Sequence, residues 1–337
     1  LDMDPISQGA LGAALAQSGG DRNKIKAGTI LGCFGGLAPD LDILIFSPTD
    51  PLLFLEFHRQ FTHSLVFIPV GALLVALVMH HLVRRFLSLI DLRFRETYLF
   101  CLLGYATHGL LDACTSYGTQ LLWPFTSERF AWNNISIIDP LFTLPVLGLA
   151  IIGVYRKNPW FGRAAFGWAI CYLLFGVLQR DRAIAGGYEL AALRGHEPIR
   201  LEAKPGFANL LLWKVVYETD DYFHVDGVRV GFENKKFPGD RALKLNLDIH
   251  FNWLDQGSQQ ARDIERFRWF SNNYLAIDPK NSNRIIDVRY SVVPNEVDAL
   301  WAIDLDSKKS IEAHIDWIVL RNTDSAQTSR WWKMLTE

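Results

Sequence analysis

The sequence has few cysteines and no excess of charge of either sign. Its 337 residues carry 34 Lys and Arg against 36 Asp and Glu, for a formal net charge of −2 at pH 7. Nothing in that balance points to a nucleic-acid partner. The cysteines form no CxxC pair, which argues against a thiolate zinc site. All of them lie in the first half of the chain, so we expect no disulfide in the second half; they are Cys33, Cys101, Cys114 and Cys171.

The sequence also lacks a signal-peptide pattern and the common catalytic loops. Its first four residues, LDMD, are acidic rather than basic, so we expect membrane insertion to depend on internal apolar segments. No GxSxG, Walker-type loop or GxGxxG motif opens a helix after a predicted strand. A serine hydrolase and a nucleotide-binding protein therefore have no support.

The chain divides into two halves of different composition. Mean hydropathy over the whole chain is only +0.09, but this average hides the division. Residues up to about 180 are mainly Leu, Ala, Gly, Phe, Ile and Val, whereas residues after about 197 are rich in Asp, Asn, Lys and Arg. We expect a membrane-embedded domain at 1–182, a linker at 183–206 and a soluble domain at 207–337.

Five apolar segments of the first half approach the length of a transmembrane helix, which needs about 20 mostly apolar residues. The first segment is interrupted by Pro39, Asp40 and Asp42, so it either crosses the membrane or forms a re-entrant hairpin buried in protein. The expected fold class is an α-helical polytopic membrane bundle of about five segments, followed by a small α+β soluble domain. The segments are residues 27–46, 64–83, 97–123, 135–155 and 160–178.

Basic residues between the segments predict the orientation, because cytoplasmic loops of membrane proteins carry an excess of Lys and Arg. If the first segment crosses fully, three basic clusters fall on the cytoplasmic side of a bacterial inner membrane. The C-terminal domain is then periplasmic, although Arg180 and Arg182 argue mildly against this. The clustered residues are Arg22, Lys24, Lys26, Arg84, Arg85, Arg93, Arg95, Arg156, Lys157 and Arg163.

Alternating apolar and polar residues predict strands in the second half, with one helix among them. Asp226-Gly227 is typical of a hairpin turn. The expected strands are 210–217, 222–232, 284–293, 299–305 and 311–320, and the expected helix is 257–270.

Histidines and aspartates recur within or beside the apolar segments, where ionisable side chains are costly and indicate function. Under the orientation above, they all fall toward the outer end of the bundle. His108 and Asp112 are four residues apart, so on a helix they share one face and can bind one ion. The others lie on less regular stretches: Asp40 and Asp42 behind a proline, His58 and His63 five apart, and Asp139 at the start of the fourth segment.

This set of side chains suits a divalent metal. Imidazole with carboxylate favours zinc, manganese or iron, and spare carboxylates permit a second ion. Each residue taken alone is more often a hydrogen-bond partner between helices, so the metal interpretation depends on the gathering of the set at one end. Arg59 would bind a phosphate or carboxylate of a substrate, or pair with Asp40 or Asp42. His80 and His81 lie at the basic end and are expected to be interfacial.

The ordered motifs resemble those of a known family, the bacterial membrane-bound metal-dependent hydrolases. These are YdjM-like inner-membrane proteins, one of which is LexA-regulated. The resemblance covers roughly residues 4–180. Its most specific element is HRQFTHS at 58–64, and the other motifs are PDLD at 39–42, GYATHGLLD at 104–112 and LLWPF at 121–125.

The resemblance implies a set of site residues. Many family members have a histidine where this chain has Gln8, which is a poor zinc ligand. A looser similarity to zinc-dependent phospholipases C, which use an HxxxD helix pair, makes a phosphoester the expected substrate class. The residues matching the family pattern are Asp40, Asp42, His58, His63, His108 and Asp112.

We therefore expect a membrane-embedded metal-dependent hydrolase that acts on a phospholipid or another phosphoester through a metal-activated water. Zinc is the expected ion, with manganese or iron as alternatives, and membrane lipid is the expected partner. Asp40, Asp42 and Arg59 would assist catalysis. The alternative is a non-enzymatic membrane scaffold or envelope-stress protein whose polar residues hold the bundle together. A metal-ion transporter ranks last, because few polar residues continue toward the opposite end of the segments.

Overall fold

The protein is described here by a computed structural model that covers residues 4–86, 92–321 and 324–337. The chain divides into two compact units. The first, here called the bundle unit, comprises residues up to Leu44 together with Phe57–Val177 and Phe207–Asn209. The second, called the C-terminal unit, comprises the remaining ranges, which are Ile45–Glu56, Leu178–Gly206 and Leu210–Glu337.

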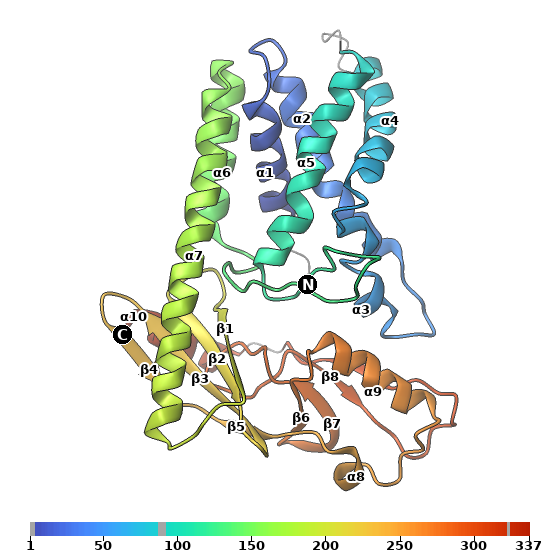
Figure 1. Cartoon of the computed structure of the whole chain (residues 1–337), viewed down its shortest axis with the longest axis vertical. Coiled ribbons are helices and arrows are strands. Elements are labelled where there is room, and N and C mark those ends of the chain that lie inside the picture. The colour runs from blue at the N-terminus through green and yellow to red at the C-terminus, as the bar shows by residue number, and fades with distance from the viewer. Residues whose placement is uncertain (1–3, 87–91, 322–323) are drawn as a thin grey trace. The chain divides into compact units, whose positions relative to one another are not determined.

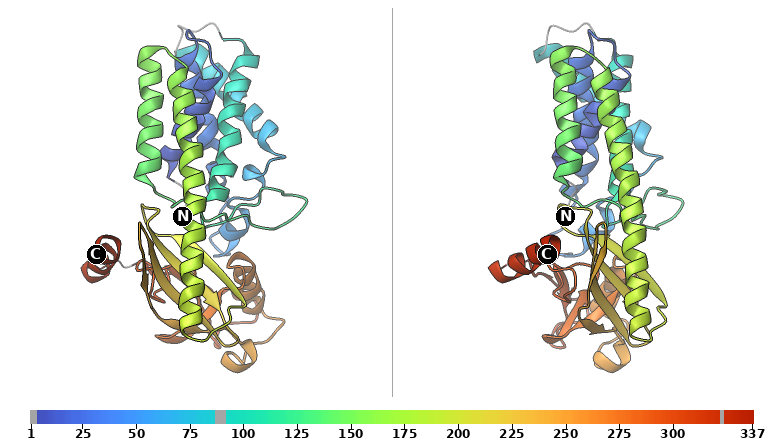
Figure 2. Two further views of the ribbon diagram at one scale, coloured as in Figure 1. Left: turned by 60° about the vertical axis from the view of Figure 1, so that its left-hand side comes forward. Right: turned by 90° about the vertical axis from the view of Figure 1, so that its left-hand side faces the viewer.

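Long helices run side by side in the bundle unit (Figures 1 and 2). Short helices connect them at one end, where the chain changes direction. The long helices are α1 Pro5–Ser18, α2 Ile25–Leu37, α4 Ile68–Phe86, α5 Phe94–Cys114, α6 Pro140–Arg156 and α7 Trp160–Leu193. The short ones are the 3₁₀ helices η1 Ala38–Leu44 and η2 Phe61–His63, whereas α3 Leu53–Phe57 and the end of α7 fall largely in the C-terminal unit.

Helix α1 was not expected from the sequence. It has only 14 residues, too few for a search for spans of about 20 residues. The local sequence nevertheless specifies it, because Asp4 caps its first turn by accepting a hydrogen bond from Ile6 N, and Pro5 follows at the first helical position. Small residues then let α1 pack closely on α2: a Cβ on Gly12 would lie 2.4 Å from Gly32 O.

The expected helical segments are present, with shifted ends. Within the part of the chain that the structure describes, three helices are long and apolar enough to cross a membrane, namely Ile25–Leu44, Ile68–Arg85 and Trp160–Leu193. The first of them runs in one direction through α2 and η1, as a span does, and forms no hairpin within the described residues (Figure 1). The third predicted segment ends early, since α5 stops at Cys114.

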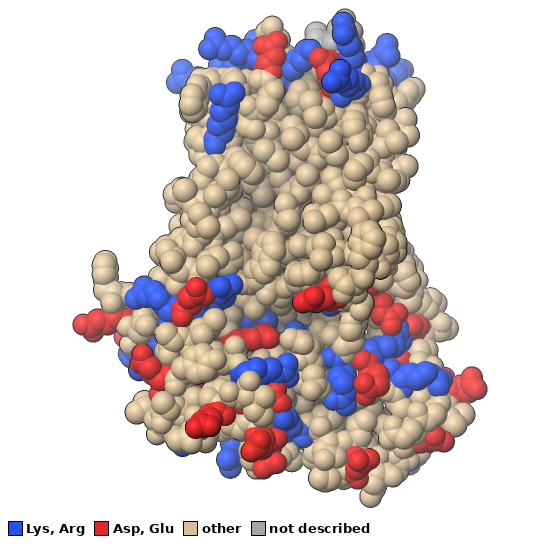
Figure 3. Space-filling model, in the orientation of Figure 1, with Lys and Arg blue, Asp and Glu red and all other residues tan. Residues whose placement is uncertain are grey.

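The basic residues gather at one end of the bundle unit. Lys24 at the start of α2 pairs with Glu96 at the start of α5, and Arg163 near the start of α7 donates to Ser18 O at the end of α1. Between that end and the opposite one, the face of the bundle seen in Figure 3 carries almost no charged side chain. An uncharged face of this kind is what contact with lipid requires.

The C-terminal unit contains two antiparallel sheets, as the expected α+β class requires. One has the strand order β1-β2-β3-β4 with β5 also paired to β3, and the other has the order β6-β7-β8-β9. Its helices are α8 Leu247–His250, α9 Gln259–Phe270 and α10 Ser325–Thr336. The strands are β1 Arg200–Pro205, β2 Leu212–Glu218, β3 Tyr222–Val230, β4 Asn234–Phe237, β5 Arg241–Leu243, β6 Leu275–Asp278, β7 Asn281–Asp287, β8 Trp301–Asp304 and β9 Asp316–Val319.

The turn predicted at Asp226-Gly227 is wrong, because β3 runs straight through it. Asp226 is fully buried there, and both its oxygens accept hydrogen bonds from Arg194. Because Arg194 provides charged hydrogen bonds to the Asp226 carboxylate inside the sheet, the chain does not have to turn there to expose Asp226 to solvent.

The stretch 183–206 holds regular structure. Helix α7 continues to Leu193, and β1 begins at Arg200. Two glycines on this part of α7 allow a close approach to the first sheet: a Cβ on Gly187 would lie 2.6 Å from a methyl carbon of Val215. Helix α7 extends beyond its apolar residues. Arg180-Asp181-Arg182 lowers the hydropathy of the segment but does not severely lower its helix propensity.

Close packing at Gly104 gives a test of the bundle. A Cβ on Gly104 of α5 would lie 2.1 Å from Gly32 O, whereas a Cβ on Gly148 of α6 would meet nothing within 4 Å. Gly104→Ala should therefore destabilise the protein by about 2 kcal/mol or more. Gly148→Ala should be neutral or stabilising by about 0.5–1 kcal/mol, because alanine favours helix. Thermal unfolding in detergent measures both, and equal melting temperatures would contradict this packing.

Candidate metal centre

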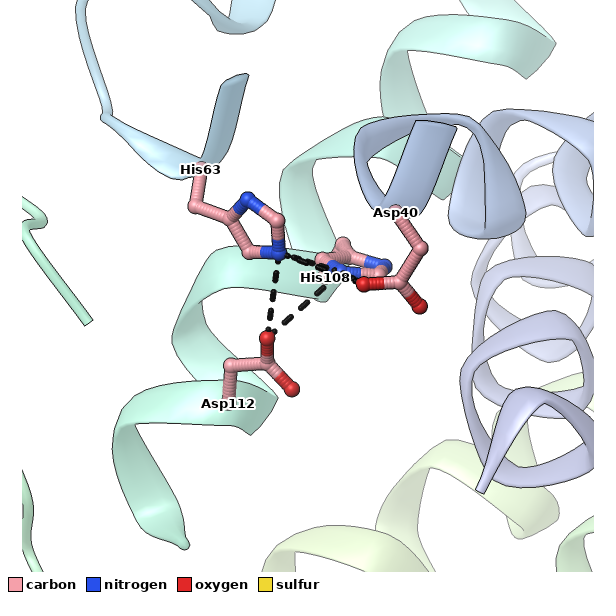
Figure 4. Close-up of side chains that lie close together, drawn as sticks. All are labelled: Asp40, His63, His108 and Asp112. Atoms are coloured by element: carbon pink, nitrogen blue, oxygen red, sulfur yellow. Dashed lines mark hydrogen bonds and ion pairs between the residues drawn. The ribbon is translucent and has the colours of Figure 1, made fainter. Parts of the chain in front are cut away.

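Four side chains from three separate segments meet inside the bundle unit. Asp40 comes from η1, His63 from η2, and His108 and Asp112 from consecutive turns of α5. Their ligand atoms all lie within 4.8 Å of one another. Figure 4 shows the two imidazoles and two carboxylates directed toward a common point.

Five of the six spacings between these atoms, 2.9 to 3.6 Å, are close to the edges of a tetrahedron around a small cation. For zinc bonds of about 2.0–2.2 Å, the edges would be about 3.3–3.6 Å. His63 Nε2 lies 2.9 Å from His108 Nε2, 3.4 Å from Asp40 Oδ1 and 3.2 Å from Asp112 Oδ2. His108 Nε2 lies 3.2 Å from Asp40 Oδ1 and 3.6 Å from Asp112 Oδ2. The donor set therefore has the size that a single zinc-like ion needs.

Outer hydrogen bonds direct both histidines inward. His108 Nδ1 lies 2.6 Å from Gly36 O, so this nitrogen donates and Nε2 keeps its lone pair for the centre. His63 Nδ1 lies 2.9 Å from Thr62 Oγ1 and 3.2 Å from Asp42 Oδ2. Orientation of the second ring nitrogen by an oxygen is the arrangement usual for metal-bound histidine.

Gly109 brings the His63 segment against α5. A Cβ at this position would lie 2.2 Å from His63 O. Only glycine allows this approach, which places His63 beside His108. The glycine within HGLLD therefore has a steric role that the spacing of ligands alone did not reveal.

Asp42 and His58, both candidate ligands, lie one layer behind the four. Asp42 Oδ1 is 2.8 Å from His58 Nδ1. Its Oδ2 accepts hydrogen bonds from the Arg59 backbone N–H at 3.0 Å and the Thr62 hydroxyl at 2.8 Å. Asp42 therefore fixes the HRQFTHS segment in place, and through it the orientation of His63.

Arg59 pairs with Asp112 rather than with the two aspartates of η1. Its side chain is completely buried, and its Nε lies 3.1 Å from Asp112 Oδ2. Nη1 donates to Thr115 Oγ1 at 3.0 Å, and the guanidinium lies 5.0 Å from the centre of the Tyr117 ring. The backbone of Arg59 has a φ of 63°, a left-handed conformation that is uncommon outside glycine and often marks functional sites.

Gln8 lies at the same centre. Its amide Nε2 donates to Asp112 Oδ1 at 2.8 Å and approaches His108 O at 3.4 Å. One oxygen of Asp112 is thereby occupied, while the other, 3.1 Å from Arg59 Nε, also faces the two histidines. A buried carboxylate oxygen that faces two imidazoles is a position at which a cation can bind.

Charge at the centre also favours a cation. The carboxylates of Asp40, Asp42 and Asp112 exceed the single guanidinium of Arg59. Burial lowers the pKa of His63, but hydrogen bonds with Asp112, Asp40 and Asp42 outweigh this and raise that pKa to about 10. A proton on His63 thus provides positive charge that a bound metal cation would otherwise provide.

Two further candidates lie outside the group. Asp139 caps α6 by accepting hydrogen bonds from Leu141 N and Phe142 N, and both its oxygens accept from the Tyr172 hydroxyl. His80 lies 2.8 Å from Thr97 Oγ1. Hydrogen bonding within the bundle accounts for both residues.

The sequence indicated the types of ligand residue but not the groups that hydrogen-bond to those ligands. The four-residue spacing of His108 and Asp112 predicted their shared face. Thr62 and Gly36 carry no such signal, because one acts through a hydroxyl beside His63 and the other through its backbone carbonyl. Gln8 was identified only as a departure from the resembled family, on a helix that the sequence did not reveal.

Comparison with known proteins gives a family match. The sequence model of the family described as YdjM inner membrane protein matches residues 3–183, which is more than half of the chain. All four ligand candidates and Gln8, Asp42, His58 and Arg59 fall inside the matched range. No solved structure matches the chain.

Two curated relatives are similar over part of the chain. Inner membrane protein YbcI of Escherichia coli is 35% identical over 115 residues, which are 33% of this chain and 60% of YbcI. The uncharacterized protein YfhP of Bacillus subtilis is 25% identical over 125 residues, which are 37% of this chain and 36% of YfhP. The chain thus matches less than two thirds of either relative.

Arg59 gives a test of the charge balance. Arg59→Leu removes the guanidinium and leaves Asp112 with an uncompensated buried charge, so we expect a loss of about 3 kcal/mol. Arg129→Leu is the matched control, because Arg129 lies 5.3 Å from the same Tyr117 ring and donates to the backbone oxygens of Gly118 and His58. Thermal unfolding in detergent should show a larger decrease in melting temperature for Arg59→Leu than for Arg129→Leu. A larger decrease in melting temperature for Arg129→Leu would contradict the pairing of Arg59 with Asp112.

Proposed function

Because this chain belongs to the YdjM inner membrane protein family, we propose that it is a metal-dependent hydrolase embedded in the inner membrane. The observation that carries the proposal is the group of two imidazoles and two carboxylates at the spacing of zinc ligands. Ionisable residues inside an apolar bundle are costly, and their convergence on one point is better explained by a shared ion than by separate helix contacts.

Zinc is the ion we propose first. Two histidine nitrogens with carboxylate oxygens suit zinc, and also manganese or iron. No thiol belongs to the group. A bound divalent ion would lower the pKa of a coordinated water from 15.7 to about 7 and supply a nucleophile at neutral pH.

The surrounding residues have separate roles in such a reaction. Asp40, with 17% of its side chain exposed, marks the accessible side of a group whose other members are buried. Its second oxygen can accept a proton from the attacking water. Arg59 Nη2 has no hydrogen-bond partner among the described residues, so it would be available to stabilise negative charge that develops on a substrate.

A phosphoester on a membrane lipid is the substrate we propose. The accessible side of the group lies on η1, where Leu41, Ile43 and Leu44 are 64%, 58% and 70% exposed. Apolar side chains so exposed beside a polar centre suit a ligand with an apolar tail and a charged head. The guanidinium of Arg59 suits a phosphate better than a neutral carbonyl.

One observation favours a second candidate, a non-enzymatic membrane protein with a structural metal. Four protein ligands would close a tetrahedral zinc site, whereas catalytic sites usually keep one position for water. The pairing of Asp112 Oδ2 with Arg59 favours the enzyme, because it leaves Asp40, His63 and His108 as three ligands with a fourth position open. A fifth ligand is also compatible with catalytic zinc.

We also propose a multi-pass orientation with the metal centre toward the periplasm. The basic clusters lie at the opposite end of the bundle unit from η1 and η2 (Figures 1 and 3), and basic residues stay on the cytoplasmic side. Helix α7 runs away from the basic end, so the C-terminal unit would also be periplasmic.

Metal content tests the function directly. The full chain, purified in detergent and loaded with zinc or manganese, should bind metal stoichiometrically, and His63→Ala and His108→Ala should each lose it because a ligand is removed. His80→Ala removes a half-buried histidine of the same bundle whose described partners are Thr97 and the Phe94 ring, and it should retain the metal. Elemental analysis after gel filtration measures all four proteins.

The outcomes separate the candidates. A wild type that takes up no metal would exclude both the hydrolase and the structural metal site. Metal uptake with release of phosphate from a lipid phosphoester would support the hydrolase. Metal uptake without hydrolysis of phosphomonoester or phosphodiester lipids would favour the scaffold.

Reporter fusions test the orientation. Alkaline phosphatase needs disulfides, which form in the periplasm and not in the cytoplasm. A fusion after Glu337 should therefore be active, and a fusion after Arg156, at the basic end of α6, should be inactive. The reverse pattern would overturn the orientation while leaving the grouping of the ligands unchanged.

A further inference from the structure

The chain leaves the bundle unit between the two halves of the candidate metal centre. It departs after Leu44, the end of η1, and returns at Phe57, just before His58. The intervening residues, Ile45–Glu56, are here called the strap and belong to the C-terminal unit. The strap therefore joins the segment with Asp40 and Asp42 to the segment with His58, Arg59 and His63.

One arginine of the C-terminal unit holds the strap at two points. Arg266 of α9 donates to both oxygens of Asp50, at 2.9 and 2.8 Å, and to Glu56 Oε1 at 2.6 Å. A third carboxylate, Asp263, also accepts from Arg266 at 3.0 Å. Its other oxygen accepts from Ile315 N at 3.2 Å, so the arginine is fixed to the framework of this unit.

Packing supports the same attachment. Phe54 meets Trp317 of β9 edge-on, with ring centres 5.3 Å apart. Leu52 and Leu55 of the strap are fully buried, at 0% and 1% exposure. Only 17% of the Arg266 side chain is exposed, so its bidentate pair with Asp50 is of the well-ordered, partly buried kind that contributes more than a surface ion pair.

We infer that Arg266 is a positioning residue for the metal centre: by fixing the strap, it sets how far the His58–His63 segment can move from η1. Glu56 is two residues from His58 and three from Arg59, whose backbone N–H donates to Asp42. A fixed strap lowers the entropy that the chain loses when Asp40 and His63 converge on one ion. This inference rests on the proposed metal site and gives the C-terminal unit a role in it.

The experiment is a zinc titration of the full chain in detergent against a chromophoric chelator. Arg266→Ala should weaken zinc binding about tenfold, the lower end of the range for residues that orient metal ligands from outside. Asp50→Asn combined with Glu56→Gln should reproduce the loss from the strap side, which keeps the test available if Arg266→Ala does not fold.

Two controls separate positioning from general destabilisation. Arg262, one turn earlier on α9, donates its described side-chain hydrogen bonds to Gln259 and Gly257 O, so Arg262→Ala should leave zinc affinity unchanged. Arg284→Ala removes the bidentate pair with Asp304 between β7 and β8, which weakens the same unit without touching the strap. It should lower the melting temperature and leave zinc affinity unchanged.

The possible results are distinct. Wild-type zinc affinity in both Arg266→Ala and the strap double variant would overturn this inference and leave the proposed metal site standing. Equal weakening in Arg284→Ala would also overturn it, because the effect would then be general. A wild type that binds no zinc would overturn the proposed function together with this inference.

Discussion

Three carboxylates, those of Asp40, Asp42 and Asp112, gather near a single guanidinium that pairs only with Asp112 among the described residues, and the arrangement of the site follows from that imbalance. Asp42 is satisfied by His58, Thr62 and a backbone N–H. One oxygen of Asp112 accepts a hydrogen bond from Gln8, and the other pairs with Arg59. Because burying an unpaired charge is costly, the remaining negative charge of Asp40 and Asp112 needs a proton or a metal ion at the two histidines. The divalent cation that we propose would satisfy it with the number and type of ligands present.

The close helix packing serves this centre. Glycines at 12, 32 and 104 bring α1, α2 and α5 together, which places Gln8 and Gly36 O within hydrogen-bonding reach of Asp112 and His108. Gly109 allows the backbone of His63 to approach α5 closely. The site thus depends on small residues at helix contacts as much as on its ligands, since a ligand set must be held within a fraction of an ångström to bind one ion.

Hydropathy and spacing predicted much of the bundle but only part of the site. The apolar segments and the shared face of His108 and Asp112 follow from local pattern. Helix α1 was missed because it is short, and the turn at Asp226 was wrongly predicted because its partner Arg194 lies 32 residues earlier in the chain. Asp40 and His63 belong to the ligand group, whereas Asp42 and His58 lie outside it. Tertiary contacts decide this difference, and residue type alone does not predict it.

X-ray absorption at the zinc edge of the loaded wild-type protein tests the central claim most directly. We expect two imidazole nitrogens and additional oxygen ligands at about 2.0–2.2 Å, with no sulfur. His108→Ala should lose one imidazole contribution. A sulfur ligand, or a spectrum without imidazole, would contradict the assignment of the ion to Asp40, His63, His108 and Asp112.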